Sequence, residues 1–354
     1  MIETLIRKDL LDLTAYPTAE RSLTHRLHAN ELPWDWLKED REAIAALVAE
    51  TPFNHYPDGG GQALREALGR LTGASPEGIV LGSGSDELIK MTAELFLEPG
   101  DAVVVHTPTF SEYGVAARIC GGRVVEVPSG PDFAIDVEAV IQAANRERAK
   151  LVFLCTPNNP TGVVLSREQV LRVVAETRSV VVCDEAYYEF SGISAAREAQ
   201  SQDRLIVLRT LSKAYGLAGL RLGYAVCTEA AAACLNRVRM PYNINSLTQG
   251  LALLALQRQA RVEALTAQLR SGRQALYEAA REIPGLEVFN GGANFLLYRT
   301  PQAPAVAALL GDQGVMTRLF SQSLMQNCIR INIGTEEANR LVLAALREVD
   351  HAAG

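Results

Sequence analysis

Short apolar runs alternate with longer segments of helical periodicity along the middle of the chain. Seven of these runs are predicted to be buried strands because β-branched residues dominate them. They are residues 78–83, 101–107, 123–128, 150–155, 179–184, 204–210 and 222–227. Amphipathic helices are predicted between several of them, as in residues 85–100 and 166–178. This alternation predicts an α/β fold, with a mostly parallel sheet sandwiched by helices.

The C-terminal part of the chain has a different pattern. A long helical pattern over residues 246–283 is followed by strand-like runs at 286–289, 293–299 and 328–334 and by a final helix. This order is typical of an α+β arrangement. We therefore expect three parts: an N-terminal arm (1–29), a large domain (30–250) and a smaller α+β C-terminal domain (251–354).

The composition narrows the class of protein. The chain has 354 residues, of which 34 are basic and 41 acidic, giving a net charge of −7. This balance argues against a general affinity for nucleic acid or for anionic membranes. The first residues contain no signal-peptide core, and no uninterrupted apolar run is long enough to cross a bilayer.

The six cysteines indicate neither a metal site nor a redox motif. They form no C-x-x-C pair and no cluster with the five histidines. Cys155 and Cys183 lie inside apolar runs, which is typical of small buried side chains. We therefore expect no metal and a reducing, cytoplasmic location.

Lys213 stands out because it follows strand 204–210 closely and has small and apolar neighbours in "SKAYGLAGLRLGY" (212–224). Open parallel sheets bind ligands beyond the carboxyl ends of their strands. A poorly solvated lysine in that place loses part of its preference for the charged form and becomes a usable nucleophile. The alternative is an ordinary lysine that extends to the surface, and Lys213 alone does not decide between the two.

Three further polar side chains are expected at the same sheet edge. Asp184 ends strand 179–184, Asn159 follows strand 150–155, and Tyr187 lies three residues beyond Asp184. Pyridoxal phosphate requires a lysine amine for its aldehyde, a carboxylate for its ring nitrogen and a donor for its ring oxygen. Together with the lysine, these residues predict a pyridoxal phosphate site.

A phosphate site is predicted in "VLGSGSDELIKM" (80–91), where a strand, a glycine turn and a helix start follow one another. The candidate cap and phosphate-binding residues are Ser83, Ser85, Asp86, Ser212 and Arg221. The same stretch could be a dinucleotide fingerprint, because Gly82 and Gly84 match G-x-G-x-x-G. Glu87 occupies the third glycine position, which disfavours a nicotinamide cofactor.

Four motifs together resemble the fold-type-I aminotransferases and, within them, the histidinol-phosphate aminotransferase branch of class II. They are "SGSDE" (83–87), "TPNNPTG" (156–162), "CDEAYYEF" (183–190) and "SKAYGLAGLRLGY" (212–224). The resemblance extends from about residue 14 to about residue 335. It implies a cytoplasmic pyridoxal 5'-phosphate enzyme of histidine biosynthesis, which transfers an amino group from histidinol phosphate to 2-oxoglutarate.

The resemblance also implies roles for single residues. Lys213 would bond to the coenzyme aldehyde and Asp184 would pair with the ring nitrogen, so these two and Tyr187 are the implied catalytic residues. The other implied coenzyme contacts are Asn159 with Tyr187 at the ring oxygen, Phe110 on the ring face, and Ser85, Asp86, Ser212 and Arg221 at the phosphate.

Substrate contacts are implied in the same way. Arg330 would bind the anionic end of the substrate, and Tyr56 would reach into the neighbouring subunit's site, which implies a homodimer. The full implied set is Tyr16, Asn30, Tyr56, Asn159, Arg318 and Arg330. For Asn30 the alternative is an ordinary helix N-cap.

Three other functions remain to be weighed. An aromatic amino-acid aminotransferase would share every coenzyme residue and differ in the side-chain pocket. "PTFSEY" (108–113) is also similar to the threonine-phosphate decarboxylases, whereas "AYGLAG" (214–219) follows the histidinol-phosphate pattern. A coenzyme-binding transcription regulator would need a DNA-binding module, and the sequence shows no basic helix-turn-helix pattern.

Overall fold

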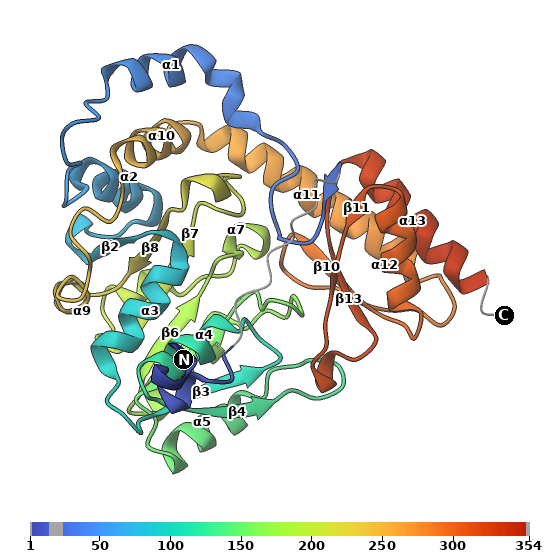
Figure 1. The fold of residues 1–354 in the computed structure, drawn as a ribbon, viewed down its shortest axis with the longest axis horizontal. Coiled ribbons are helices and arrows are strands. Elements are labelled where there is room, and N and C mark those ends of the chain that lie inside the picture. Colours follow the sequence, from blue (N-terminus) through green and yellow to red (C-terminus); the bar gives the residue numbers. More distant parts are fainter. Residues whose placement is uncertain (1, 14–23, 352–354) are drawn as a thin grey trace.

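The computed structural model describes residues 2–13 and 24–351, and a seven-stranded sheet forms its centre (Figure 1). The strand order is β2-β8-β7-β6-β5-β3-β4. All neighbouring strands are parallel except β8, which is antiparallel to β2 and β7. The bounds are β2 Ile79–Gly82, β3 Ala102–Thr107, β4 Arg123–Pro128, β5 Leu151–Cys155, β6 Val180–Asp184, β7 Leu205–Thr210 and β8 Gly223–Val226. The seven predicted strands are confirmed.

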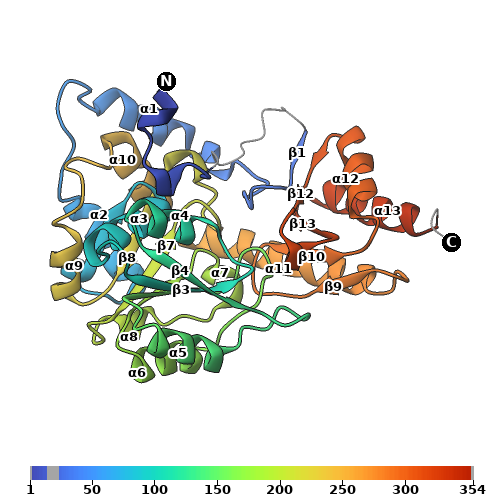
Figure 2. The same cartoon turned by 60° about the horizontal axis from the view of Figure 1, so that its bottom comes forward.

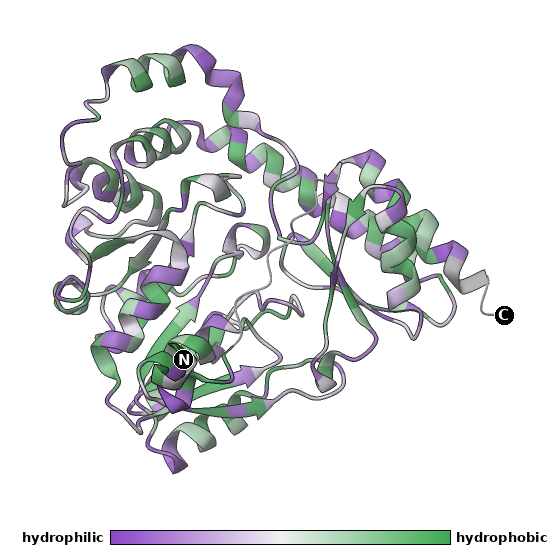
Figure 3. Cartoon of the chain, in the orientation of Figure 1, coloured by the Kyte–Doolittle hydropathy of each residue, from purple (hydrophilic) through white to green (hydrophobic). Residues whose placement is uncertain are grey.

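Helices cover both faces of this sheet, as Figure 2 shows for α3 and α5. One face packs against α3 (Gly84–Phe96), α4 (Glu112–Ile119) and α9 (Glu229–Leu235). The other face packs against α2 (Gln62–Thr72), α5 (Val137–Arg146), α6 (Arg167–Glu176), α8 (Ala196–Ala199) and α10 (Ser246–Leu256). Successive strand residues such as Val152 and Phe153 belong to the apolar cores on opposite faces of the sheet. Strands that are buried on both faces therefore consist of continuous apolar runs, as the hydropathy colours in Figure 3 show.

The predicted helix over residues 246–283 is wrong in one respect, because it is two helices. The first, α10, ends at Leu256, and α11 (Gln259–Ala280) begins three residues later. Arg258, between them, has the non-helical dihedrals φ −103° and ψ 33°. Its guanidinium pairs with the carboxylate of Asp40 at 3.0 Å. The apolar periodicity runs through the break without interruption, so the sequence pattern predicts one helix here.

A second, smaller sheet near the C-terminus is antiparallel, with the order β12-β13-β10-β9. It packs against α11, α12 (Ala303–Asp312) and α13 (Glu336–His351) around its own apolar core. The strand bounds are β9 Glu287–Phe289, β10 Phe295–Arg299, β12 Arg318–Leu319 and β13 Cys328–Asn332. The expected smaller α+β unit is therefore present.

The segment before the large sheet lies against the C-terminal unit. β1 (His25–Arg26) pairs in parallel with β11 (Val315–Met316), and the backbone N–H of Asn332 donates to Leu27 O at 2.9 Å. This pairing brings residues 27–30 between the two sheets. The remaining helices are α1 (Arg41–Glu50) and α7 (Tyr188–Ser191), with 3₁₀ turns at Ile2–Leu5, Lys8–Leu10, Trp36–Asp40, Pro76–Gly78, Ala218–Leu220 and Ser323–Met325.

Within residues 2–13 and 24–351, no helix is both long and apolar enough to span a bilayer. The same described ranges contain no group of three or more His, Cys, Asp or Glu side chains that could hold a metal ion.

Candidate active site

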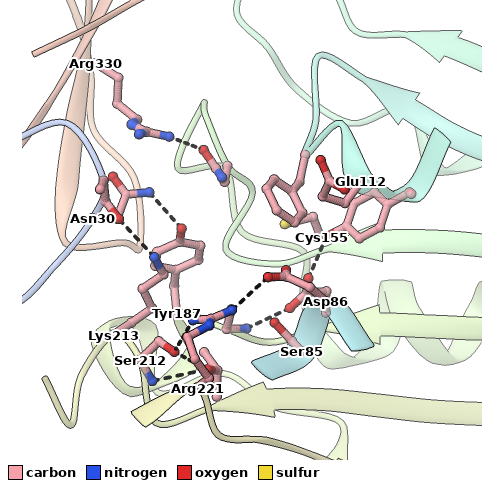
Figure 4. Close-up of a pocket in the computed structure, with 17 residues that line it drawn as sticks. Asn30, Ser85, Asp86, Glu112, Cys155, Tyr187, Ser212, Lys213, Arg221 and Arg330 are labelled. Carbon is pink, nitrogen blue, oxygen red and sulfur yellow. Dashed lines mark hydrogen bonds and ion pairs between the residues drawn. The ribbon is translucent and has the colours of Figure 1, made fainter. Parts of the chain in front are cut away.

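A cavity of about 360 Å³ lies at the carboxyl ends of β5, β6 and β7 (Figure 4). Asp184 ends β6, Asn159 lies four residues beyond β5, and Lys213 lies three residues beyond β7. Parallel strands place such residues at one sheet edge, which explains why positions distant in the chain meet here. The sequence-predicted residues that line the cavity are Asn30, Ser85, Asp86, Phe110, Asn159, Asp184, Tyr187, Ser212, Lys213, Arg221 and Arg330.

The Lys213 amine points into the cavity. Its Nζ donates to the backbone oxygen of Ala29 at 3.0 Å and lies 5.9 Å from the centroid of the Tyr187 ring. Burial lowers the pKa of Lys213 to about 8, and the positive charge of Arg330 acts in the same direction. The neutral, nucleophilic amine is therefore much more populated near pH 7 than in an exposed lysine.

This lowered pKa predicts an unusual labelling profile. In the coenzyme-free protein, we expect modification of Lys213 by a small amine-reactive reagent to rise with pH and to level off above about pH 8. Exposed Lys90 on α3 provides a matched control peptide in the same digest, which checks reagent access and recovery. Peptide mass spectrometry measures both peptides, and labelling of Lys213 that still rises steeply near the ordinary lysine pKa of about 10.4 would contradict the lowered pKa of Lys213.

The Asp184 carboxylate is buried and held at both oxygens. The Tyr113 hydroxyl donates to its Oδ2 at 2.7 Å, and the backbone N–H of Ala186 donates to its Oδ1 at 3.0 Å. Burial raises the pKa of Asp184 to about 6, and the hydrogen bond from Tyr113 opposes that rise. Asp184 is thus mostly ionised at pH 7 and lies at the floor of the cavity without a cationic contact among the described residues.

Tyr187 and Asn159 lie between the two sheets. Nδ2 of Asn30 donates to the Tyr187 hydroxyl oxygen at 2.7 Å, and burial raises the pKa of Tyr187, so the phenol stays protonated. Oδ1 of Asn159 accepts a hydrogen bond from Nη1 of Arg330. Tyr187 and Asn159 are thus hydrogen-bonded to Asn30 and Arg330, two residues that lie outside the large sheet.

An anion cradle forms at the start of α3. Arg221 pairs with Asp86 at 2.9 Å and donates to Ser212 Oγ at 3.4 Å. Gly84 has a φ of +77°, and a Cβ there would lie 2.6 Å from Nη2 of Arg221. A Cβ on Gly223 would likewise lie 2.4 Å from the backbone N of Ser85. Glycine at both positions keeps the backbone N–H groups and the guanidinium open to a phosphate.

The expected cap of this helix needs a correction. Ser83 occupies the N-cap position of α3, but its side chain makes no capping hydrogen bond. The backbone N–H of Ser83 instead donates to the carboxylate of Glu87. Glu87 thus stabilises the turn from its side chain, at the position where a dinucleotide fingerprint would have glycine.

Arg330 forms the wall opposite the sheet edge. It projects from β13 with 6% of its surface exposed, and its guanidinium carbon lies 5.2 Å from the Phe295 ring centroid and 6.0 Å from that of Phe320. It donates to Asn159 and to the backbone oxygen of His28. The aromatic rings hold a planar cation that can bind an anionic group in two contacts.

Not every expected substrate residue lines the cavity. Arg318 is paired with Arg330 across β12 and β13 but is not part of the cavity lining. Tyr56 is 80% exposed and stacks on Tyr242, with ring centroids 4.5 Å apart. Tyr16 lies outside the described residues. The cap alternative for Asn30 is wrong, because the next helical turn begins at Trp36 and Asn30 is directed toward Tyr187.

Six residues that line the cavity were not predicted from the sequence as site residues: Ala29, Glu112, Tyr113, Cys155, Ala186 and Thr210. Tyr113 lies in the first turn of α4 and its ring packs edge-on against Phe110, with ring centroids 5.7 Å apart, a contact that the sequence pattern did not indicate. Cys155 was assigned as a buried apolar residue; it is buried, but it also lies under the cavity.

The donor set fits pyridoxal phosphate. A lysine with a lowered pKa, a buried carboxylate, a protonated phenol and an open anion cradle all face one cavity. Each meets one requirement of the coenzyme, namely its aldehyde, its ring nitrogen, its ring oxygen and its phosphate. The pocket residues therefore have the chemistry that the sequence analysis predicted.

Comparison with known proteins agrees with this geometry. The family model described as aminotransferase class I and II matches residues 25–346. A histidinol-phosphate aminotransferase of Ruminiclostridium cellulolyticum is 37% identical over 351 residues, covering 98% of each chain. One of Desulfitobacterium hafniense is 38% identical over 361 residues, again covering 98% of each. The crystal structure of the Sinorhizobium meliloti histidinol-phosphate aminotransferase with pyridoxal-5'-phosphate superposes with a TM-score of 0.89 and 28% identity, covering 99% of this chain and 98% of that one.

Proposed function

Because this chain belongs to the class I and II aminotransferases, we propose that it is a pyridoxal phosphate enzyme that transfers the amino group of histidinol phosphate to 2-oxoglutarate, as a step of histidine biosynthesis. The observation that carries the proposal is the lining of one cavity by Lys213, Asp184 and the Arg221 cradle. The names of relatives that match nearly the whole chain support the choice of amino donor.

Each group of the coenzyme has a proposed partner. Lys213 would hold the aldehyde, Asp184 the ring nitrogen, and Tyr187 with Asn159 the ring oxygen, while Phe110 covers the ring face. The phosphate would be bound by the side chains of Ser212 and Arg221 and by the backbone at Ser85 and Asp86. When bound, the coenzyme supplies an electron sink for the charge that develops at the substrate's α-carbon.

Asp184 and Lys213 are proposed to control the two proton positions that the reaction needs, at the ring nitrogen and at the substrate's α-carbon. The Asp184 carboxylate, ionised at pH 7, keeps a proton on the ring nitrogen by pairing with it in a buried place. Lys213 would be the base at the substrate's α-carbon, because burial lowers the pKa of its amine to about 8 and Nζ can therefore accept and release a proton near neutral pH.

The hydrogen bond from Tyr113 is expected to keep the pKa of Asp184 lower than it would otherwise be. The Tyr113→Phe change removes the donor to Oδ2 and raises the pKa of Asp184, so at pH 7 more of the carboxyl is protonated. We expect coenzyme affinity at pH 7 to fall roughly tenfold to a hundredfold, as for the loss of one hydrogen bond to a charged group, and to recover partly at pH 8.5. Absorbance titration of the coenzyme-free protein at both pH values measures this.

Tyr298→Phe is the matched control for that change. Tyr298 is also fully buried, but its hydroxyl has no hydrogen-bond partner among the described residues. Its loss should leave coenzyme affinity unchanged. Equal affinity for the two variants would show that the Tyr113 hydroxyl does not act on Asp184.

The substrate's anionic end is proposed to bind Arg330, with Arg318 and Tyr16 as further contributors. A guanidinium fork accepts both a phosphate monoester and a carboxylate, so one residue can serve the amino donor and then 2-oxoglutarate. The two substrates would therefore use the same site in turn, which predicts ping-pong kinetics.

A homodimer is part of the proposal. Tyr56 and Tyr242 form a stacked pair that is largely exposed on one chain, beside exposed Phe53 and Met240. Exposed aromatic clusters of this kind are typical of interaction surfaces. This exposure supports a subunit interface at Tyr56, and the family resemblance leads us to propose that Tyr56 reaches from there into the neighbouring subunit's site.

Subunit mixing tests the dimer. A Lys213→Ala chain and a Tyr56→Ala chain are each expected to be nearly inactive as homodimers. When they are unfolded and refolded together, hybrid dimers contain one intact site, and part of the activity should return. If no mixture is more active than the separate variants, Tyr56 does not act across subunits.

We propose a cytoplasmic location from the state of the cysteine thiols. All six cysteines are free in the structure, which supports a reducing cytoplasm.

The choice of histidinol phosphate as amino donor is tested against two alternatives, phenylalanine and threonine phosphate. The loaded enzyme is mixed in single turnover with histidinol phosphate, phenylalanine or threonine phosphate, and the absorbance of the bound coenzyme is followed. We expect histidinol phosphate to convert the coenzyme to its amino form fastest. Fastest conversion by phenylalanine would assign an aromatic aminotransferase, and release of carbon dioxide from threonine phosphate would assign a decarboxylase.

A further inference from the structure

The turn at Ala29–Asn30 contacts two groups of the cavity at once. Asn30 has a left-handed φ of 56° and is only 2% exposed, although it lies in an irregular segment. An asparagine tolerates this backbone region better than most residues do. The turn lies between β1 and Trp36, and residues far along the chain surround it.

The first contact is made by the backbone. Nζ of Lys213 donates to the carbonyl oxygen of Ala29 at 3.0 Å across 184 positions of sequence (Figure 4). The amine therefore has a backbone acceptor at the edge of the cavity. A carbonyl acceptor at this distance gives the flexible lysine stem a defined end point.

The second contact is made by the Asn30 side chain. Its Nδ2 donates to the Tyr187 hydroxyl oxygen at 2.7 Å (Figure 4). Since that oxygen acts here as an acceptor, the hydroxyl proton of Tyr187 is free to be donated to another group. Donation to the phenol oxygen also polarises the O–H bond and makes it a better donor.

The turn is itself anchored from the smaller sheet. Nδ2 of Asn294 donates to the backbone oxygen of Asn30 at 3.2 Å, and the backbone N–H of Asn332 donates to Leu27 O at 2.9 Å. Asn294 and Asn332 are both buried. The placement of the turn therefore depends on the unit that also carries Arg330.

We propose that the Ala29–Asn30 turn is a positioning element, in which the Ala29 carbonyl sets the resting place of the Lys213 amine and the Asn30 amide sets the donor direction of Tyr187. Asn30 then acts through Tyr187 and is not a substrate ligand. This inference rests on the proposed function, because it assigns to the two positioned groups their roles in transamination.

Three substitutions separate the parts of the turn. Asn30→Gly keeps the left-handed backbone, and with it the Ala29 carbonyl, but removes the donor to Tyr187. Asn30→Asp keeps the size of the side chain and replaces the donor with an acceptor, which would draw the Tyr187 proton away from the cavity. Asn327→Gly is the matched control, since Asn327 is an exposed asparagine with a φ of 63° and lies outside the cavity lining.

The first readout is a spectroscopic pH titration of the loaded enzyme. A donor to the ring oxygen stabilises the high-pH form, in which that oxygen is negatively charged and the lysine nitrogen is uncharged. Loss of the donor therefore raises the midpoint of the titration. We expect Asn30→Gly to raise the midpoint by about half a pH unit and Asn30→Asp by at least as much. Tyr187→Phe should raise it more, and adding Asn30→Gly to Tyr187→Phe should have no further effect.

The second readout is catalysis. We expect kcat of Asn30→Gly to fall roughly fivefold to tenfold, the size expected for one lost hydrogen bond, with an unchanged KM for the amino donor. A raised KM with unchanged kcat would make Asn30 a substrate ligand and overturn the proposal. A midpoint equal to that of Asn327→Gly, or a fully additive double variant, would also overturn it.

Failure of this inference is distinguishable from failure of the proposed function. If the unaltered enzyme transaminates and the Asn30 variants titrate and turn over like it, the positioning role is wrong and the proposed function stands. If the unaltered enzyme binds the coenzyme but transfers no amino group from any donor tested, the proposed function fails. Should Asn30→Gly not fold, the Asn30→Asp titration decides the inference.

Discussion

Replacing Lys213 with alanine is expected to abolish turnover, with a loss of about 10⁴-fold or more, the upper end for removing a catalytic base. The substitution removes both the nucleophile for the coenzyme aldehyde and the base for the α-carbon proton. Steady-state transamination of histidinol phosphate with 2-oxoglutarate measures the effect. Retained activity would remove Lys213 from the chemistry.

The same variant is expected to fold. Among the described residues, the Lys213 side chain donates one hydrogen bond, to Ala29, and its charged form is disfavoured by burial. Because its pKa in the folded chain is below the unfolded value, the ammonium lowers stability at pH 7, and removing it should not lower the melting temperature of the coenzyme-free protein. Lys90→Ala, at an exposed position on α3, is the control and should keep full activity.

Replacing Asp184 with asparagine is expected to lower kcat by several orders of magnitude. Asparagine has nearly the same shape and can still accept from the backbone of Ala186, but it carries no charge to keep a proton on the ring nitrogen. The electron sink is then lost while the pocket remains. Single-turnover absorbance with histidinol phosphate isolates this step from product release.

Asp312→Asn provides the control for this change. Asp312 ends α12 on an exposed surface and is not part of the cavity lining, so its loss of charge should not alter the rate. Near-normal turnover in the Asp184 variant would contradict the role of this carboxylate.

The residues that the sequence predicted best are those at strand ends. Asn159, Asp184 and Lys213 each follow or end a continuous apolar run, and parallel strands bring such positions to one edge. Their proximity in the structure therefore follows from the local apolar pattern together with the parallel arrangement of the strands. The glycine turn before α3 was also predicted, although the closeness of Gly223 to Ser85 was not.

The parts that could not be predicted depend on contacts between distant segments. A backbone carbonyl such as that of Ala29 has no residue-type signal, so its contact with Lys213 had no trace in the sequence. The two-residue strand β1 is too short to show a period of two. The break at Arg258 between α10 and α11 also leaves no mark on the apolar periodicity, which continues through it.

The most direct test of the central claim is to reduce the loaded protein with borohydride, digest it and locate the coenzyme by peptide mass spectrometry. The chain contains five lysines, so Lys8, Lys38, Lys90 and Lys150 are internal controls in one sample. We predict that the added mass is on the peptide containing Lys213 and that prior treatment with histidinol phosphate prevents the labelling. Attachment to another lysine, or none at all, would contradict the account.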